Sequence, residues 1–258
     1  MENDGRITCV VFGSIPSSAE CVRYLLENPA YRLLGVVTDP DYRCSWAANE
    51  QHVIDVAVEY AIPLLEMDEI IELKPQWGFS LRFNRIIKPD VINSFSKGIL
   101  NFHGGILPYN KGACCLNWAL LYGQPEFGIT VHYIDPGIDT GDIVEVLSWK
   151  VEEDDTAWTL FKKQLELMPG LFLKIIKKIE KGEVLTGVPQ DQLREHDWPM
   201  WTKKKSDLEK CKKIDLSVLK ANPQEALRTI RAFDFPGREP AYTIIDDKKV
   251  YLRISTSE

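Results

Sequence analysis

The chain of 258 residues carries 31 Lys and Arg against 38 Asp and Glu, so its formal net charge is −7, and 45% of its residues are hydrophobic. These proportions are those of a globular protein, and the length suffices for one large or two modest domains. The acidic balance disfavours nucleic acid as a partner, because a polyanion needs a basic face, and no apolar run approaches the roughly 20 residues of a membrane span.

The first residues do not resemble a secretion signal, because Glu2 and Asp4 precede the first apolar run and no cleavage site of small residues follows. We therefore expect a cytoplasmic protein that does not bind a membrane. The six cysteines fit that compartment as free thiols. None of them forms a C-x-x-C pair or lies beside paired histidines, so no zinc or other metal is expected.

Buried strands and amphipathic helices alternate along the first hundred residues. The pattern predicts strands at 6–13, 33–38, 63–65, 78–83 and 99–102, and helices at 18–28, 51–60, 68–73 and 89–94. Such alternation predicts an α/β fold with a doubly wound, Rossmann-like and mostly parallel sheet, whose ligands bind at the carboxyl ends of the strands. Gly13 follows the first strand without a G-x-G-x-x-G pattern, so NAD is not expected.

The rest of the chain divides near residue 185. Before that point the pattern predicts a helix at 113–122, strands at 128–134 and 143–149, and a long helix at 156–181 that ends at Gly182. After it, we expect a helix at 223–233 and a β-hairpin with strands at 241–245 and 249–254. We therefore predict a main domain at 1–185 and a smaller C-terminal region at 186–258.

The segment NFHGGILP, from Asn101 to Pro108, is the most informative part of the chain. Asn101 and His103 are two residues apart at the end of a predicted strand, so their side chains point to the same side. Gly104 and Gly105 then allow a sharp turn or a close approach to a ligand. An amide and an imidazole are groups that stabilise an oxyanion and handle a proton in acyl transfer.

The glycine-rich loop 135–142 supplies the carboxylates Asp135, Asp139 and Asp142. A carboxylate within hydrogen-bond reach of His103 would raise the pKa of that imidazole and fix its tautomer. Spacing alone does not choose among the three. His132 lies in a strand of alternating pattern, where we expect a partly buried structural imidazole.

These residues resemble those of the folate-dependent formyltransferase family. The two segments that carry the resemblance are NFHGGILP and GITVHYIDPGIDTGDI. That family uses an Asn-x-His pair and an Asp in a D-x-G turn, with N10-formyltetrahydrofolate as the formyl donor. The resemblance implies that Asn101, His103 and Asp139 are the catalytic residues.

Within the family, His-Gly-Gly-x-Leu-Pro and residues 78–84 are similar to the branch that acts on nucleotide-linked amino sugars, the dTDP-4-amino-4,6-dideoxyglucose formyltransferase-like enzymes. The implied acceptor is an amino dideoxy sugar on dTDP, or on GDP or UDP, destined for O-antigen of lipopolysaccharide or a related surface glycan. Two alternatives stay open. One is a methionyl-tRNA formyltransferase, which residues 230–237 resemble equally, and the other is a noncatalytic folate- or nucleotide-binding relative.

The same resemblance implies the remaining site residues. Those expected to line the folate are Arg85, Ile86, Ile87, Asp135, Pro136, Gly137 and Ile138. Those expected to contact the acceptor are Ser14, Ser80, Arg82, Asn84, Gly105, Lys111 and Trp201. Arg82 suits phosphate, and Trp201 could stack on a base, although core packing explains Trp201 equally well. The exposed-looking hairpin at 241–254 predicts a homodimer, because an unpaired strand edge invites a partner.

Overall fold

The computed structural model describes residues 5–194 and 196–254. Segments that alternate along the sequence form two compact units. The first consists of Met1–His103, Ile129–Leu147 and Leu165–Arg194, and the second of Gly104–Gly128, Ser148–Gln164 and Glu195–Glu258. Within the described ranges no helix has both the length and the apolar character needed to cross a bilayer. The domain boundary expected between residues 185 and 186 stays a prediction.

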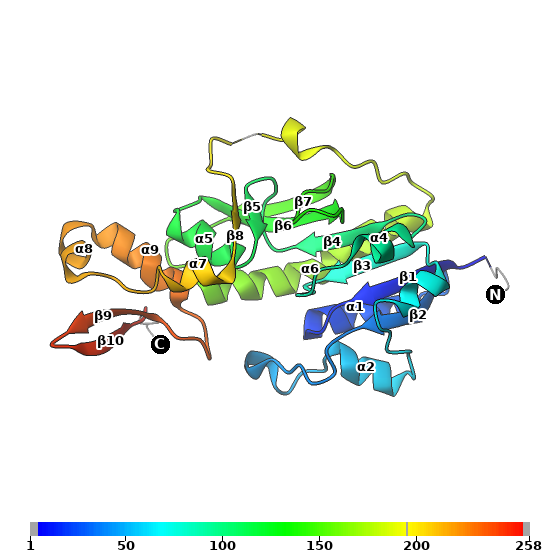
Figure 1. Ribbon diagram of the computed structural model, residues 1–258, viewed down its shortest axis with the longest axis horizontal. Helices are drawn as coiled ribbons and strands as arrows, with labels where there is room; N and C mark the ends of the chain where they lie inside the picture. The colour runs from blue at the N-terminus through cyan, green and yellow to red at the C-terminus, as the bar shows by residue number, and fades with distance from the viewer. Residues whose placement is uncertain (1–4, 195, 255–258) are drawn as a thin grey trace. The chain divides into compact units, whose positions relative to one another are not determined.

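A six-stranded sheet is the centre of the first unit (Figure 1). Its order is β2 (Tyr31–Val37), β1 (Ile7–Phe12), β3 (Trp77–Leu81), β4 (Ile99–His103), β6 (Glu126–Tyr133) and β7 (Ile143–Lys150). Strands β2, β1, β3 and β4 pair in parallel, whereas β4 and β6 are antiparallel. The predicted doubly wound, mostly parallel sheet is therefore confirmed. The strand expected at 63–65 is reduced to one bridge between Val36 and Leu64.

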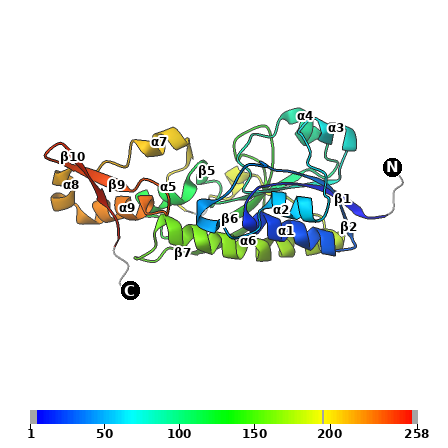
Figure 2. The same ribbon diagram turned by 90° about the horizontal axis from the view of Figure 1, so that it is seen from below.

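Helices cover both faces of this sheet (Figure 2). On one face lie α1 (Pro16–Glu27) and α6 (Ala157–Glu180), and on the other α3 (Glu69–Leu73) and α4 (Pro89–Asn93); α2 (Val53–Glu59) and the 3-10 turn η1 (Ser45–Ala47) follow β2. Strand residues alternate between the faces. The rings of Phe79 and Phe102 lie 5.3 and 5.6 Å from that of Phe172 in α6. Phe12 and Ile99 belong to the buried cluster on the α3 and α4 face.

The strand order reverses beside β1, which has β2 on one side and β3 on the other. Because β1, β3 and β4 run in parallel, the residues that follow their carboxyl ends emerge at one edge of the sheet. Doubly wound sheets bind ligands at this edge, next to such a reversal. Ser14, Arg82 and the end of β4 at His103 all lie there.

The second unit contains the predicted helices α5 (Cys115–Leu121) and α9 (Pro223–Phe233) and the hairpin of β9 (Ala241–Ile245) and β10 (Lys248–Leu252). Asn222 caps α9 by accepting the backbone N–H of Glu225. Asp246 and Asp247 both have positive φ, as a two-residue hairpin turn requires, so β10 already begins at Lys248.

Four short elements of the second unit were not predicted: β5 (Asn110–Gly112), β8 (Trp201–Lys203), α7 (Lys205–Glu209) and α8 (Leu216–Ala221). β5 and β8 pair in parallel, with Asn110 opposite Trp201. A three-residue strand has no period that can be read from sequence, and its partner lies far away along the chain. Such elements depend on tertiary pairing for their existence.

Candidate active site

Two polar side chains of strand β4 lie on the same face of the sheet as the side chain of Ile99, the first residue of that strand. Asn101 is half-buried and His103 is buried, while the intervening Phe102 faces α6. The antiparallel register with β6 places His132 directly opposite Asn101. The parallel register with β3 places Ser80 on the other side of Asn101. Since paired residues point to the same face, these polar groups form one row at the end of the sheet.

The loop after β6 brings Asp139 to this row. Asp135 Oδ1 accepts the backbone N–H of Gly137 at 3.0 Å and the hydroxyl of Thr140 at 2.6 Å, so Asp135 shapes the loop itself. A Cβ on Gly141 would lie 1.9 Å from the carbonyl oxygen of Tyr133, so only glycine fits there. Within this turn Asp139 adopts a φ of +51°, a left-handed conformation that aspartate tolerates better than most residues.

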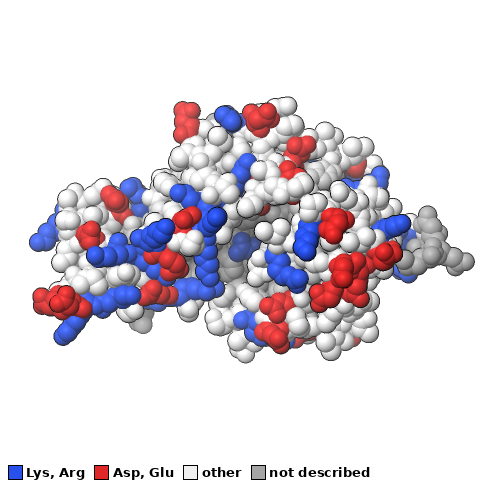
Figure 3. Space-filling model, in the orientation of Figure 1, with Lys and Arg blue, Asp and Glu red and all other residues white. Residues whose placement is uncertain are grey.

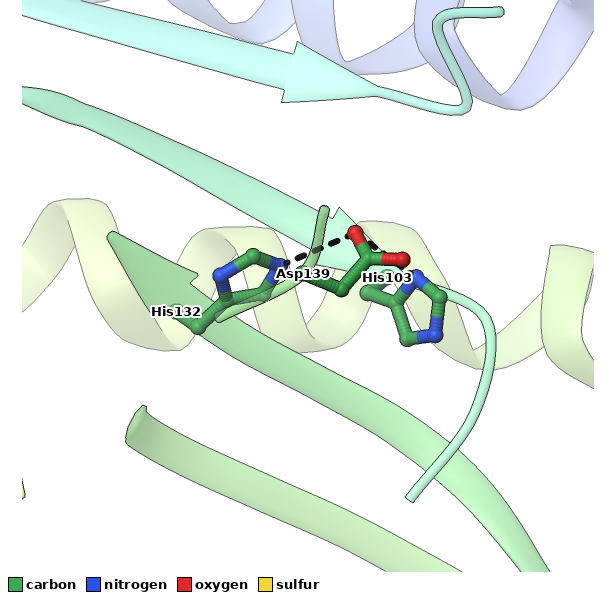
Figure 4. A group of neighbouring side chains, drawn as sticks. All are labelled: His103, His132 and Asp139. Carbon is green, nitrogen blue, oxygen red and sulfur yellow. Dashed lines mark ion pairs between the residues drawn. The ribbon is translucent and has the colours of Figure 1, made fainter. Parts of the chain in front are cut away.

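Asp139 lies between two imidazoles (Figure 4). Its Oδ1 is 3.5 Å from His103 Nδ1 and 3.7 Å from His132 Nε2. Asn101 Nδ2 lies 3.0 Å from His132 Nε2. The structure therefore brings together the three residues that the family resemblance implied, and adds His132, for which sequence reasoning predicted only a structural role. Of the rival carboxylates, Asp135 acts on His132 only as a weak opposing charge, and neither Asp135 nor Asp142 forms a described ion pair or hydrogen bond with either imidazole.

The hydrogen bonds of His132 define its tautomer. Its Nδ1 lies 2.7 Å from the carbonyl oxygen of Tyr133, which can only accept, so Nδ1 carries the proton. Nε2 then accepts from the amide of Asn101. Burial, followed by the charge of His103, lowers the pKa of His132 from its ordinary 6.5 to about 4, and the charge of Asp139 opposes this without reversing it. His132 is therefore neutral at pH 7, so of the two imidazoles only that of His103 can form an ion pair with Asp139.

This arrangement prepares two donors for an oxyanion. The Asn101 amide has two N–H groups. The one bonded to His132 sets the orientation of the amide, and the second makes no hydrogen bond to any described residue and can donate to a ligand. His103 directs Nδ1 toward Asp139, so its Nε2 points away from the carboxylate (Figure 4). A protonated His103 and the Asn101 amide can thus stabilise negative charge on a carbonyl oxygen, and His103 can then pass on its proton.

We expect the buried His132 to make the protein sensitive to acid. Above about pH 6.5 the ring is neutral in both the folded and the unfolded chain, whereas between about pH 6.5 and 4 only the unfolded chain binds the proton. The free energy of unfolding should fall over this window, by about 3 kcal/mol in total. Urea unfolding of the wild type and His132→Gln at several pH values checks this. Equal pH dependence of the two proteins would contradict it.

The residues expected around the folate differ in exposure. Ile86 and Ile138 are 81% and 53% exposed, whereas Ile87 is 6% exposed and packs into the cluster of Phe12 and Ile99. Arg85 is exposed, and its guanidinium lies over the ring of Phe83. Pro136 and Gly137 are exposed in the Asp139 loop. An apolar ring system would find uncovered aliphatic surface at two of these positions.

Among the residues expected to contact the acceptor, four belong to the first unit. Ser80 is buried beside Asn101, Arg82 is half-buried with a φ of +58°, and Asn84 is exposed. Ser14 Oγ accepts the backbone N–H of Asp39 at 3.2 Å and lies 3.1 Å from the Thr38 hydroxyl. Ser14 thus connects the ends of β1 and β2.

The other three expected acceptor residues belong to the second unit. Gly105 is buried, and Lys111 is half-buried in β5. Trp201 is 8% exposed, and its ring lies 4.7 Å from that of Tyr122. Trp201 is therefore part of the packing of its unit, and its stacking on a base stays a prediction.

His103, His132 and Asp139 together offer three ligand atoms that lie within 4.8 Å of one another. Two imidazoles and a carboxylate form a donor set that suits zinc. The Nε2 of His132, however, accepts a hydrogen bond from Asn101, and a metal would have to displace that amide. We therefore expect activity to survive dialysis against EDTA, and micromolar Zn²⁺ to inhibit. Loss of activity with the chelator, restored by one metal, would contradict this.

Comparison with known proteins relates the site to a family. A family profile described as Formyl transferase matches residues 66–176, which contain the whole cluster. Methionyl-tRNA formyltransferase of Kosmotoga olearia is 30% identical over 237 residues, an alignment that covers 87% of this chain and 73% of that protein. The methionyl-tRNA formyltransferase of Lactiplantibacillus plantarum is 29% identical over 201 residues, and the match spans 62% of its length.

Among solved structures, an N-formyltransferase from Helicobacter canadensis, in complex with folinic acid and dTDP-3-aminofucose, has the same fold. The TM-score is 0.76 at 24% identity, over 95% of this chain and 86% of that one. The profile match, together with 30% identity to a relative of which 73% is covered, shows that this chain belongs to the formyl transferase family.

Proposed function

We propose that the protein transfers a formyl group from N10-formyltetrahydrofolate to the amine of a nucleotide-linked amino sugar. The observation that carries the proposal is the cluster of Asn101, His103, His132 and Asp139 at the ligand-binding edge of a formyl transferase fold. It combines two oxyanion donors with a histidine that a carboxylate orients, as acyl transfer to an amine requires.

In the proposed reaction the amine nitrogen attacks the formyl carbon, and the carbonyl electron pair moves onto oxygen. Asn101 and protonated His103 hold that oxygen. The amine loses a proton as the new carbon–nitrogen bond forms, and the departing N10 must gain one. His103 is the group placed to move these protons, and Asp139 at 3.5 Å holds its ring in position.

Two of the residues expected around the formyl donor expose aliphatic surface against which the face of a ring can pack. Ile86 and Ile138 expose most of their aliphatic surface. Ile138 directly precedes Asp139, so a ring covering it would lie beside the catalytic carboxylate. The structure from Helicobacter canadensis that shares this fold was solved with folinic acid, a formylated folate.

The acceptor is the less constrained half of the proposal. A dTDP-linked sugar is favoured by the His103-Gly104-Gly105 sequence and by the match over most of both chains to a structure that holds dTDP-3-aminofucose. Arg82, half-buried at the end of β3, is suited to a phosphate. The product would enter a surface glycan such as O-antigen, and we propose that the reaction takes place in the cytoplasm.

Methionyl-tRNA is the second candidate acceptor, because the curated relatives with 29–30% identity carry that name. Lys and Arg side chains gather on the second unit in Figure 3, interspersed with acidic ones. Its exposed lysines include Lys204, Lys205 and Lys210. Against this, the chain as a whole has a net charge of −7. Binding of tRNA would show a steep dependence on salt.

The test is mass-spectrometric detection of a formyl gain after incubation with N10-formyltetrahydrofolate. The acceptors are a panel of nucleotide-linked 3-amino and 4-amino sugars, with methionyl-tRNA alongside, and His103→Asn is the control. We expect the wild type, but not His103→Asn, to formylate a sugar nucleotide. If methionyl-tRNA were the one acceptor formylated, the proposed acceptor would be wrong and methionyl-tRNA would take its place. If no acceptor were formylated, the noncatalytic alternative would be favoured.

We also propose that the protein is a homodimer that pairs through its hairpin. Val250 and Tyr251 in β10 are 39% and 53% exposed, and within the described residues β10 has a strand partner only in β9. Val250→Asp should convert a dimer to a monomer in sedimentation equilibrium at micromolar concentration, because a negative charge at this exposed apolar position opposes strand pairing. Val184→Asp, at a position 87% exposed in the first unit, is the control. A monomeric wild type would contradict the proposal.

A further inference from the structure

Residues 185–190, here called the strap, lie against the loop that carries Asp139. Val188 exchanges two backbone hydrogen bonds with Ile143, at 2.8 and 2.9 Å. The Tyr133 hydroxyl donates to the carbonyl of Leu185 at 2.9 Å. A Cβ on Gly187 would come within 2.5 Å of Asp142, so the backbones approach closely there. The strap therefore holds both ends of the loop, at Tyr133 and at Ile143.

Gln190, the last residue of the strap and the first of the 3-10 turn η2 (Gln190–Gln192), reaches the middle of the loop. Its Nε2 donates to the carbonyl oxygens of Asp139 at 2.9 Å and of Gly141 at 2.8 Å. Because both partners only accept, the amide orientation is unambiguous. Gln190 is 7% exposed, so water cannot readily replace these bonds.

One of these two bonds acts on the peptide of Asp139 itself, and the other on that of Gly141. Asp139 has a φ of +51°, which a non-glycine residue keeps only where its surroundings hold it. Its carboxylate must stay beside His103 Nδ1 at 3.5 Å. Rotation of the Asp139 peptide would move that carboxylate, and it would also break the bond from Gln190. The Gln190 amide therefore opposes the motion that would separate Asp139 from the imidazole.

We infer that Gln190 is a positioning residue for the reaction, acting through the backbone of Asp139 rather than through contact with substrate. The expected effect of Gln190 on kcat rests on the proposed function. Its expected effect on the structure, which is to keep Asp139 between the two histidines, does not depend on that function. The inference also means that residues 185–190 help to position the active site, although they lie about fifty positions after Asp139 in the sequence.

The experiment compares Gln190→Met with Tyr31→Phe. Methionine keeps the length of the side chain and removes both donors. Tyr31→Phe is matched, because the buried Tyr31 hydroxyl also donates to a buried carbonyl, that of Ile176 at 2.9 Å, but makes no described contact with the loop. Both variants should lose stability. Only Gln190→Met should lower kcat, by ~10- to 100-fold with little change in KM, because a small displacement of a catalytic group has that effect.

Two further measurements separate positioning from general destabilisation. In Gln190→Glu the carboxyl can donate to a carbonyl only when protonated. Burial at this position, beside two carbonyl oxygens, raises the pKa of that carboxyl, so kcat relative to wild type should rise as the pH falls from about 8 to about 6.5. Nuclear magnetic resonance of the imidazole rings should show His103 and His132 signals displaced in Gln190→Met and unchanged in Tyr31→Phe. This second measurement needs no substrate, so it tests the inference even if the wild type transfers no formyl group.

The inference is overturned if Gln190→Met keeps kcat within about twofold of wild type. It is equally overturned if the two imidazole signals in Gln190→Met match those of the wild type. If Gln190→Met does not fold, Gln190→Glu provides the same two readouts, and a ratio of kcat values that does not change with pH would then count against the inference.

Discussion

Replacement of His103 by asparagine is expected to lower kcat by roughly 10³-fold or more, with the fold intact. The substitution removes both an oxyanion donor and the group that moves protons, each of which contributes about 10²- to 10³-fold in comparable sites. The fold should survive, because His103 ends a strand whose apolar neighbours Leu100 and Phe102 stay in place. Formylation assays and thermal unfolding of the same preparations provide the measurement.

His196→Asn is the control for this substitution, because His196 belongs to the second unit and stacks on Trp198 at 3.9 Å. That variant should turn over at the rate of the wild type. Full activity of His103→Asn would remove His103 from the mechanism and with it the proposed assignment of the cluster.

The second large effect is expected for Asp139→Asn, on the order of a 10³-fold loss of kcat. Asparagine preserves the shape of the side chain and tolerates the left-handed backbone at this position, where alanine would add strain. The loss would thus come from the missing carboxylate charge beside His103 Nδ1, which holds the ring in position in the wild type. Single-turnover kinetics with saturating donor and acceptor separate this from weaker binding.

Asp142→Asn is the matched control, because it makes the same chemical change three residues away on an exposed side chain of the same loop. Activity close to that of the wild type is expected for it. If both aspartate variants lost activity equally, a change in loop structure or in net charge would explain the result, and the specific pairing of Asp139 with His103 would be disproved.

The sequence was sufficient for most of the first unit because the signals involved are local. Apolar runs and helical periodicity predicted the parallel sheet, and the observed strands Ile7–Phe12 and Ile99–His103 lie close to the predicted ranges. The two-residue period of a strand was enough to place Asn101 and His103 on one face. The resemblance to a family then implied which acidic residue in the loop would join them.

Short elements escaped the sequence analysis for the opposite reason. Strands β5 and β8 have three residues each, and each exists only because the other is present. Nothing within either segment distinguishes it from a loop. The hairpin of β9 and β10, in contrast, was predictable because its turn residues, Asp246 and Asp247, lie next to each other between two strand-like runs in the sequence.

The sequence by itself therefore determined the α/β class, the parallel sheet and the shared face of Asn101 and His103. The tertiary structure alone decided that Asp139 reaches both imidazoles, that His132 orients Asn101, and that Gln190 holds the loop. The physical reason is range. Periodicity and turn preferences act between neighbours along the chain, whereas the register of β4 on β6 and the bond from Gln190 to Asp139 join residues 31 and 51 positions apart.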